Sequence, residues 1–369
     1  MTRTSGKSRW LWQLPVLMLL AGAAQAQGRY DITVVRGPTD NIFASAVNNR
    51  AQIAGTMPGG GLGQAVLYDR GNVTPLGTLG GPFSQAHDLN ERGEVVGESV
   101  NSAGQTRAFL YAHGAMRDIG TLGGFSAHAQ GINNAGQITG DATTSGGLTH
   151  AFRYNRGAMT DLGTIGGDFS SGLDINARGA VAGYSSIADS PVSVHAFLHE
   201  GGSMRDLGTL GGRDSIAMAL NDAGHVVGFS ATPVSNGHAF FYANGVMQDL
   251  GTLGGAFSIA EGINNQGQIV GVSTLPDAGA TDRGFVYSGG VMRDLNSLID
   301  PASGWTIQNA WDINDRRQIL AFGCRNNDCT ALLLSPVMST PEPASWMTAL
   351  SGLALLGLLG HRRGRKPRH

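Results

Sequence analysis

The stretch DLGTLGG, residues 206–212, is not unique in this chain, and its recurrence sets the architecture. Four close copies and one degraded copy occupy residues 76–81, 119–124, 162–167, 250–255 and 295–298. Successive copies lie 43 to 45 residues apart. A fixed period of this size indicates one supersecondary unit used many times, with each copy stacked on its neighbour to bury an apolar face.

Each unit contains four segments with the composition of β-strands. In the unit that spans residues 213–255, these segments are 215–220, 225–230, 238–242 and 246–253. A polar turn separates the first two segments, and Asn244-Gly245 predicts a hairpin between the last two. The loop between the second and third segments varies in length, and such loops often carry binding residues. No segment has a sustained helical period, so we expect an all-β protein.

Four strands in about 43 residues match the size of a β-propeller blade. Seven units align on the turn after the first strand, and their seventh member, residues 301–338, lacks a fourth strand. The alternating segment 30–35 stands before the first unit, and pairing it with the last unit would remove two exposed edges. We therefore predict a seven-bladed β-propeller over residues 27–338, closed by an N-terminal strand. The alternative is a β-solenoid with two coils per unit, which leaves segment 30–35 without a partner.

Residues 1–26 have the three parts of a secretory signal peptide. The basic residues Arg3, Lys7 and Arg9 precede an apolar run at 10–22, and Ala24-Gln25-Ala26 is a small-residue cleavage site. The apolar run is short for a permanent membrane span. We expect cleavage after Ala26 and export across the inner membrane, with an uncleaved anchor as the alternative.

The C-terminal segment, residues 339–369, also has three parts. The triplet Pro341-Glu342-Pro343 precedes an apolar run at 346–360 and a basic tail. This segment resembles the PEP-CTERM sorting signal of Gram-negative bacteria. The resemblance implies recognition by an exosortase, a membrane enzyme that cuts at this signal, and a link to exopolysaccharide and biofilm production. The apolar run predicts a short transmembrane helix that holds the precursor transiently in the inner membrane, with the basic tail inside. An unprocessed tail anchor is the alternative.

The body of the chain is acidic once both ends are set aside. The ends hold eight of the 25 Lys and Arg residues, and the 17 that remain are all Arg, against 27 acidic residues in the whole chain. The body therefore carries a charge of about −10, whereas the full chain carries −2. A lysine-free acidic body does not attract phosphate backbones, so nucleic acid is not an expected partner.

A second motif, His-Ala-Phe, recurs at residues 150–152, 195–197 and 238–240, and Ile-Asn-Asn-x-Gly recurs at 132–136 and 263–267. Together with the DLGTLGG copies, these motifs resemble the HAF-repeat family of extracellular proteins over residues 43–335. The resemblance implies a secreted or cell-surface protein. It implies no established activity and no functional residues.

Most conspicuous polar positions have a structural interpretation. Cys324 and Cys329, the only cysteines, predict a disulfide across a hairpin in an oxidising compartment, because a zinc site would need further ligands. His150, His195 and His238 share one repeat position that carries other residue types elsewhere, so hydrogen bonding is favoured over metal ligation. The aspartates before the Leu-Gly or Leu-Asn pair are expected to accept backbone N–H groups at a turn, with calcium loops as the alternative. These are Asp118, Asp161, Asp206, Asp249 and Asp294.

No catalytic motif breaks the repeat symmetry, so the sequence predicts no catalytic residue, no cofactor and no metal site. Trp305 and Trp311 in the seventh unit are the candidate ligand contacts, because exposed Trp can stack on sugars; core packing at the ring closure is the alternative. We predict a non-enzymatic binding or structural protein of the cell surface or exopolysaccharide matrix. The alternative, a polysaccharide lyase or hydrolase with a site at one mouth of the ring, rests on analogy between folds.

Overall fold

The computed structural model describes residues 29–337 apart from 38–40, 59–61, 189, 236, 277–278 and 280. This part consists of strands and two short 3-10 segments, Leu295–Leu298 and Pro301–Ser303, which confirms the all-β expectation. It contains no helix that is long and apolar enough to cross a membrane. The predicted signal peptide, the Pro341-Glu342-Pro343 triplet and the apolar run at 346–360 lie outside the described residues.

The sheets are antiparallel meanders of four strands that pair in chain order. The strands of the first six meanders are β2–β5 (Phe43–Val47, Gln52–Met57, Gln64–Asp69, Asn72–Pro75), β6–β9 (Gly80–Leu89, Val95–Asn101, Thr106–Ala112, Ala115–Asp118), β10–β13 (Gly123–Ile132, Ile138–Thr144, Thr149–Asn155, Ala158–Asp161), β14–β17 (Gly166–Ile175, Val181–Ile187, Ser190–Glu200, Ser203–Asp206), β18–β21 (Ser215–Leu220, Val226–Ser230, His238–Ala243, Val246–Asp249) and β22–β25 (Ser258–Ile263, Ile269–Thr274, Asp282–Ser288, Val291–Asp294). One parallel pair, Thr149 with Phe169, joins two meanders into an eight-stranded sheet.

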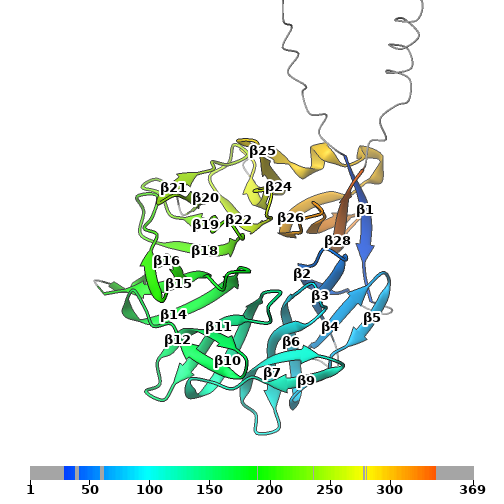
Figure 1. Ribbon diagram of the computed structural model, residues 1–369. Helices are drawn as coiled ribbons and strands as arrows, with labels where there is room; N and C mark the ends of the chain where they lie inside the picture. Colours follow the sequence, from blue (N-terminus) through cyan, green and yellow to red (C-terminus); the bar gives the residue numbers. More distant parts are fainter. Residues whose placement is uncertain are drawn as a thin grey trace, which may run out of the picture.

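The remaining sheet is completed by the N-terminal strand. It contains β26 (Thr306–Ile313), β27 (Ile319–Arg325) and β28 (Asp328–Pro336), and β1 (Tyr30–Val35) pairs antiparallel with β28. Figure 1 shows β1 and β28, from opposite ends of the colour scale, side by side in a ring of sheets. The predicted pairing of segment 30–35 with the last unit is confirmed. The ring is propeller-like, and the open-ended solenoid is not the fold observed.

The core lies between neighbouring sheets. A phenylalanine from the third strand of five sheets is fully buried, and Phe109, for example, packs with Ala54 and Ala65 of the preceding sheet. The innermost strands carry a β-bulge, as between Ala86 and Asp88. At Gly97 opposite this bulge, a Cβ atom would lie 1.9 Å from the Gln85 carbonyl oxygen, so only glycine allows the approach. The five phenylalanines are Phe109, Phe152, Phe197, Phe240 and Phe285.

Seven asparagines close the ring at its axis. Each donates from Nδ2 to the backbone carbonyl oxygen of the next asparagine, at N–O distances of 2.8 to 3.3 Å. Each Oδ1 accepts from the backbone N–H groups two and four residues later in its own turn. One side chain therefore both shapes a turn and binds the next sheet. The members of this asparagine ring are Asn48, Asn90, Asn133, Asn176, Asn221, Asn264 and Asn314.

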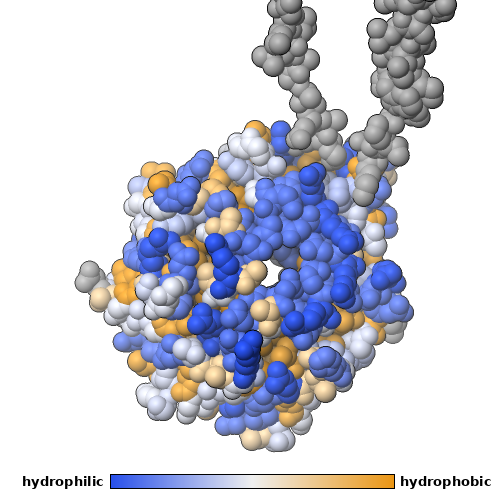
Figure 2. Space-filling model, in the orientation of Figure 1, coloured by the Kyte–Doolittle hydropathy of each residue, from blue (hydrophilic) through white to orange (hydrophobic). Residues whose placement is uncertain are grey.

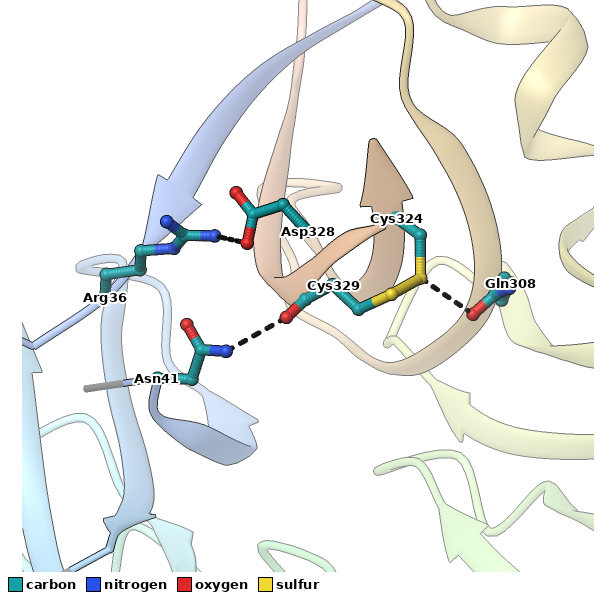
Figure 3. Close-up of a disulfide and its surroundings, with 6 residues drawn as sticks. All are labelled: Arg36, Asn41, Gln308, Cys324, Asp328 and Cys329. Carbon is teal, nitrogen blue, oxygen red and sulfur yellow. Dashed lines mark hydrogen bonds and ion pairs between the residues drawn. A yellow bond between two sulfur atoms is a disulfide. The ribbon is translucent and has the colours of Figure 1, made fainter. Parts of the chain in front are cut away.

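The closing sheet carries the predicted disulfide. Cys324 and Cys329 are joined across the hairpin between β27 and β28, so the disulfide prediction is confirmed. Figure 3 shows the segment after β1 docked on this hairpin, where Arg36 forms an ion pair with Asp328. Asn41 Nδ2 also donates to the Cys329 carbonyl oxygen at 3.0 Å. The bridge thus stiffens the hairpin that receives the N-terminal strand.

We expect Asn314→Ala to lower the free energy of unfolding by about 2 kcal/mol, because it removes the donor to Asn48 and the acceptor for two turn N–H groups. Urea unfolding followed by circular dichroism measures this. The control is Asn155→Ala, at an exposed position at the end of β12. Equal stability of the two variants would contradict a structural role for the ring.

Candidate functional site

Two cavities lie along the axis of the ring. The narrow mouth, about 210 Å³, is lined by the asparagine ring and the residues next to it. The wide cavity, about 300 Å³, is lined by Ala44 and by one residue from each of seven innermost strands. Figure 2 shows the channel opening at the centre of the ring, with hydrophilic residues around much of it. The seven residues are Ser45, His87, Gln130, Leu173, Met218, Glu261 and Trp311.

The strand directions place the variable loops around the wide cavity. Each innermost strand begins on that face and ends at the asparagine ring, so the loop between the second and third strands returns to the wide-cavity face. The described chain ends lie on the opposite face, because β1 starts and β28 finishes there. The Val337 N–H donates to the Arg29 carbonyl oxygen at 2.7 Å.

The lining of the wide cavity departs from the repeat. Ser45, His87 and Gln130 supply consecutive polar groups, whereas Leu173 and Met218 on the following sheets are apolar. Glu261 and Trp311 complete the circle, and no Lys or Arg of the described chain lines either cavity. One wall can therefore hydrogen-bond a ligand while another offers an apolar face, which is the composition usual for small-molecule sites.

A cluster of charged side chains adjoins the polar wall. His128 Nδ1 lies 2.9 Å from Asp141 Oδ2, and His128 Nε2 lies 3.4 Å from Glu98 Oε2. Ser171 Oγ donates to the other Asp141 oxygen at 3.0 Å. The hydrogen bond to Asp141 raises the pKa of His128, and burial raises the pKa of Glu98. The shift favours the protonated form of His128, which lies between two carboxyl groups.

His87 links this charged cluster to the wide cavity. Burial lowers the pKa of His87 to about 4, and the neighbouring His128 adds to the effect. His87 Nε2 is shielded from solvent and has no hydrogen-bond partner in the described part of the chain. The ring is therefore neutral near pH 7, and its Nε2 is covered by neighbouring atoms although the residue lines the cavity.

Glu261 is the one carboxylate that lines the wide cavity within the described chain. It accepts a hydrogen bond from Asn309 Nδ2 at 3.0 Å. Burial raises the pKa of Glu261 to about 7, and this bond only partly offsets the burial. Asn309 precedes Trp311 by two residues on β26, so the carboxylate and the indole belong to adjacent sheets.

Three further carboxylates bind neighbouring sheets between the wide cavity and the asparagine ring. Asp88, Asp174 and Asp312 each accept one N–H group from their own strand and one from the next sheet. Burial raises the pKa of Asp174 and of Asp312 to about 6 and raises the pKa of Asp88 well above its usual value. These groups use both oxygens on backbone N–H groups, so their role is to hold sheets together.

The two tryptophans predicted as ligand contacts have different environments. Trp311 is half-buried, lines the wide cavity and packs near the Phe322 ring, with 5.8 Å between centroids. Trp305 is 8% exposed and packs in the core of the closing sheet. The Arg325 guanidinium lies 4.7 Å from its ring centroid. Trp305 thus has the core-packing position, and Trp311 alone of the pair faces the channel.

The recurrent histidines and aspartates bind each other on the third and fourth strands. His150 Nδ1 lies 2.8 Å from Asp161 Oδ2, and the same pairing recurs at His195–Asp206 and His238–Asp249. The second Asp161 oxygen accepts the Gly163 N–H, as expected for a turn. The expected hydrogen bonds at the recurrent histidines and at the turn aspartates are therefore present. In the described chain no group of three or more His, Cys, Asp and Glu residues is arranged to hold a metal ion.

The Glu98–His128–Asp141 cluster is not predicted from the sequence, although the aligned repeats contain a sign of it. Glu98 and Asp141 occupy the same repeat position, eight residues after the turn asparagine, in two consecutive units. The same position carries Tyr184, Phe229 and other uncharged residues elsewhere. Two adjacent acids at one repeat position were the visible break in symmetry.

No family model and no curated protein matches the chain. Among solved structures, it is similar to a catalytically inactive virginiamycin B lyase from Staphylococcus aureus with quinupristin, at 9% identity and TM-score 0.51, covering 84% of this chain and 100% of that one. A puromycin-hydrolyzing peptidase from Mycobacterium tuberculosis gives 12% identity and TM-score 0.51, with 80% and 49% covered. At these identities the likeness establishes a β-propeller-like fold and nothing about activity.

We expect the difference in free energy of unfolding between the wild type and Asp174→Asn to depend on pH. The wild type should lose about 2 kcal/mol relative to the variant as pH rises from 4 to 7. Because folding raises the pKa of Asp174 to about 6, the protonated carboxyl favours the fold, and this contribution is lost as pH rises through about 6. Urea unfolding of both proteins at several pH values measures the difference. Comparing the pair cancels the opposite contribution of His87, which is lost as pH falls from 6.5 towards 4.

The matched control is Asp31→Asn, because Asp31 is exposed on β1. A pH-independent difference between wild type and Asp174→Asn would show that burial does not penalise the Asp174 carboxylate. At acid pH, Asp174→Asn is expected to have a lower free energy of unfolding than the wild type, since an amide nitrogen cannot accept the Leu220 N–H.

Proposed function

We propose that the chain is an exported seven-bladed β-propeller that binds glycan without turning it over, at the cell surface or in the exopolysaccharide matrix. The observation that carries the proposal is the wide cavity, where Trp311 and a polar wall meet at the centre of the variable-loop face. Glycan sites combine an aromatic face for the sugar ring with carboxylate, amide or imidazole groups for its hydroxyls. All of these groups are present on the innermost strands.

The blade number is supported by the asparagine ring. Its seven members come from seven sheets once the eight-stranded sheet is divided at its single parallel pair. The wide cavity is also lined by residues of all seven of these units, with Ala44 and Ser45 from the first and one residue from each of the others. Each unit thus contributes to the axis, as blades of a propeller do.

The charged cluster favours binding over catalysis. Both His128 ring nitrogens lie against carboxylates, so this imidazole is held in place and has no free nitrogen to move a proton. A volume of about 300 Å³ lies at the small end of the range for ligand sites and suits one or two sugar rings. A second candidate, a polysaccharide lyase or hydrolase, is favoured by the proximity of Glu98 and Asp141 to the channel.

The proposed localisation rests on the two end segments of the sequence. The predicted signal peptide at 1–26 and the PEP-CTERM-like segment at 339–369 support export and exosortase recognition. The repeat motifs over residues 43–335 support membership of the HAF-repeat family. The described chain leaves the ring at Val337 on the face opposite the wide cavity. A precursor held in the inner membrane by its C-terminal segment would therefore have the wide cavity directed away from the membrane.

Export is tested by expressing the full chain in a Gram-negative host that has an exosortase. We expect to find the protein outside the inner membrane. Its intact mass should correspond to a chain that begins at Gln27 and ends before residue 346. The control host lacks the exosortase and should retain the C-terminal segment. A protein that keeps both ends and stays in the inner membrane would contradict this part of the proposal.

Binding is tested by calorimetry of the purified protein with the exopolysaccharide of the organism that makes it. We expect saturable binding without new reducing ends or unsaturated products, and Trp311→Ala should weaken it about tenfold. The control is Phe125→Ala, an exposed aromatic near the start of β10. Release of product would overturn the non-enzymatic proposal in favour of the second candidate, and equal effects of the two substitutions would exclude the wide cavity as the site.

A further inference from the structure

Within the described chain, the lining of both cavities carries carboxyl groups and no Lys or Arg. The cluster beside the wide cavity places one imidazole, His128, between two carboxyl groups. A polyanion such as a uronic acid chain would therefore find no basic side chain on this lining to pair with. The channel carboxylates are Glu91, Asp222 and Asp315 at the narrow mouth, Asp88, Asp174 and Asp312 between the cavities, Glu261 in the wide cavity and Glu98 and Asp141 beside it.

Glu261 differs from the aspartates below it and from Asp141 in having a single hydrogen bond and no charged partner in the described chain. The aspartates below it use both oxygens on backbone N–H groups, and Asp141 contacts both His128 and Ser171. Glu261 has one bond from a neutral amide, although a carboxylate can accept about four. A buried carboxylate of this kind is stabilised by a positive partner, which a ligand can supply.

The surroundings of Glu261 suit a sugar that carries that positive partner. Trp311 on the adjacent innermost strand supplies a ring for stacking and for a cation–π contact. Across the cavity, the Gln130 side chain lines the wall and its amide can pair with hydroxyl groups. An ammonium group has Glu261 as the one carboxylate on the wide-cavity lining of the described chain.

We propose that the wide cavity binds an amino sugar, with its protonated amine on Glu261, its ring face on Trp311 and its hydroxyls toward Gln130. This inference rests on the proposed glycan-binding function and names its ligand class. The site selects a free amine, because an N-acetyl group carries no charge to pair with Glu261 and a carboxylate would oppose it.

The test compares three soluble tetrasaccharides by calorimetry at pH 7 and low salt, where about half of Glu261 is ionised before binding: glucosamine, N-acetylglucosamine and galacturonate oligomers. The glucosamine tetramer should bind at least about tenfold more tightly than its N-acetylated form, and the galacturonate tetramer should not bind. Glu261→Gln should abolish the tenfold preference, since the amide keeps the shape and removes the charge. Glu91→Gln at the narrow mouth is the matched control and should leave the preference intact.

A measurement on the wild type keeps the test decisive if Glu261→Gln does not fold. Affinity for the glucosamine tetramer should fall as salt rises, whereas that of the N-acetylated form should not. Equal binding of the two tetramers, or a preference that survives Glu261→Gln, would overturn the inference. If neutral oligomers bind through Trp311 without a preference for amines, glycan binding is supported and the amino-sugar inference is overturned. If the three tetramers and the exopolysaccharide all fail to bind, both the glycan-binding proposal and the amino-sugar inference are overturned.

Discussion

The hydrogen bond from Asn314 Nδ2 to the Asn48 carbonyl oxygen joins residues 266 positions apart and completes the asparagine ring. Every sheet depends on this ring, because each asparagine shapes the turn after its own innermost strand and holds the next sheet at the same time. The ring also determines what the channel contains. The residue three positions before each asparagine is brought to the axis, so seven unrelated side chains form one cavity.

The repeat made most of the fold predictable. In the unit that spans residues 213–255, the sequence predicts a first strand at 215–220, where β18 lies. It also predicts the observed pairing of segment 30–35 with the last unit. The fourth strand was placed at 246–253 but ends at Asp249, since this side chain accepts the Gly251 N–H and turns the backbone out of the sheet. Composition alone does not show such a local hydrogen bond.

The site was less predictable because one repeat position carries seven unrelated side chains around the wide cavity. The disulfide and the His–Asp pairs could be inferred from spacing, since both are local to one hairpin. Glu98 and His128 come together only through the packing of one sheet against the next, and a β-bulge sets which side chains face the channel. Trp305 and Trp311 could not be told apart for the same reason, as one faces the core and the other the axis.

The meeting of the two chain ends has a mechanical consequence. Arg29 and Val337 are hydrogen-bonded neighbours at one end of an antiparallel pair, so tension applied between them would load the rungs of β1 and β28 one at a time. Such a pair peels apart at low force, whereas strands pulled from opposite ends must shear all rungs together. The disulfide and the Arg36–Asp328 ion pair lie at the far end and would be reached last. The ring is therefore suited to attachment through one of these two ends. A force that pulls both ends in opposite directions would separate β1 from β28 and open the ring there.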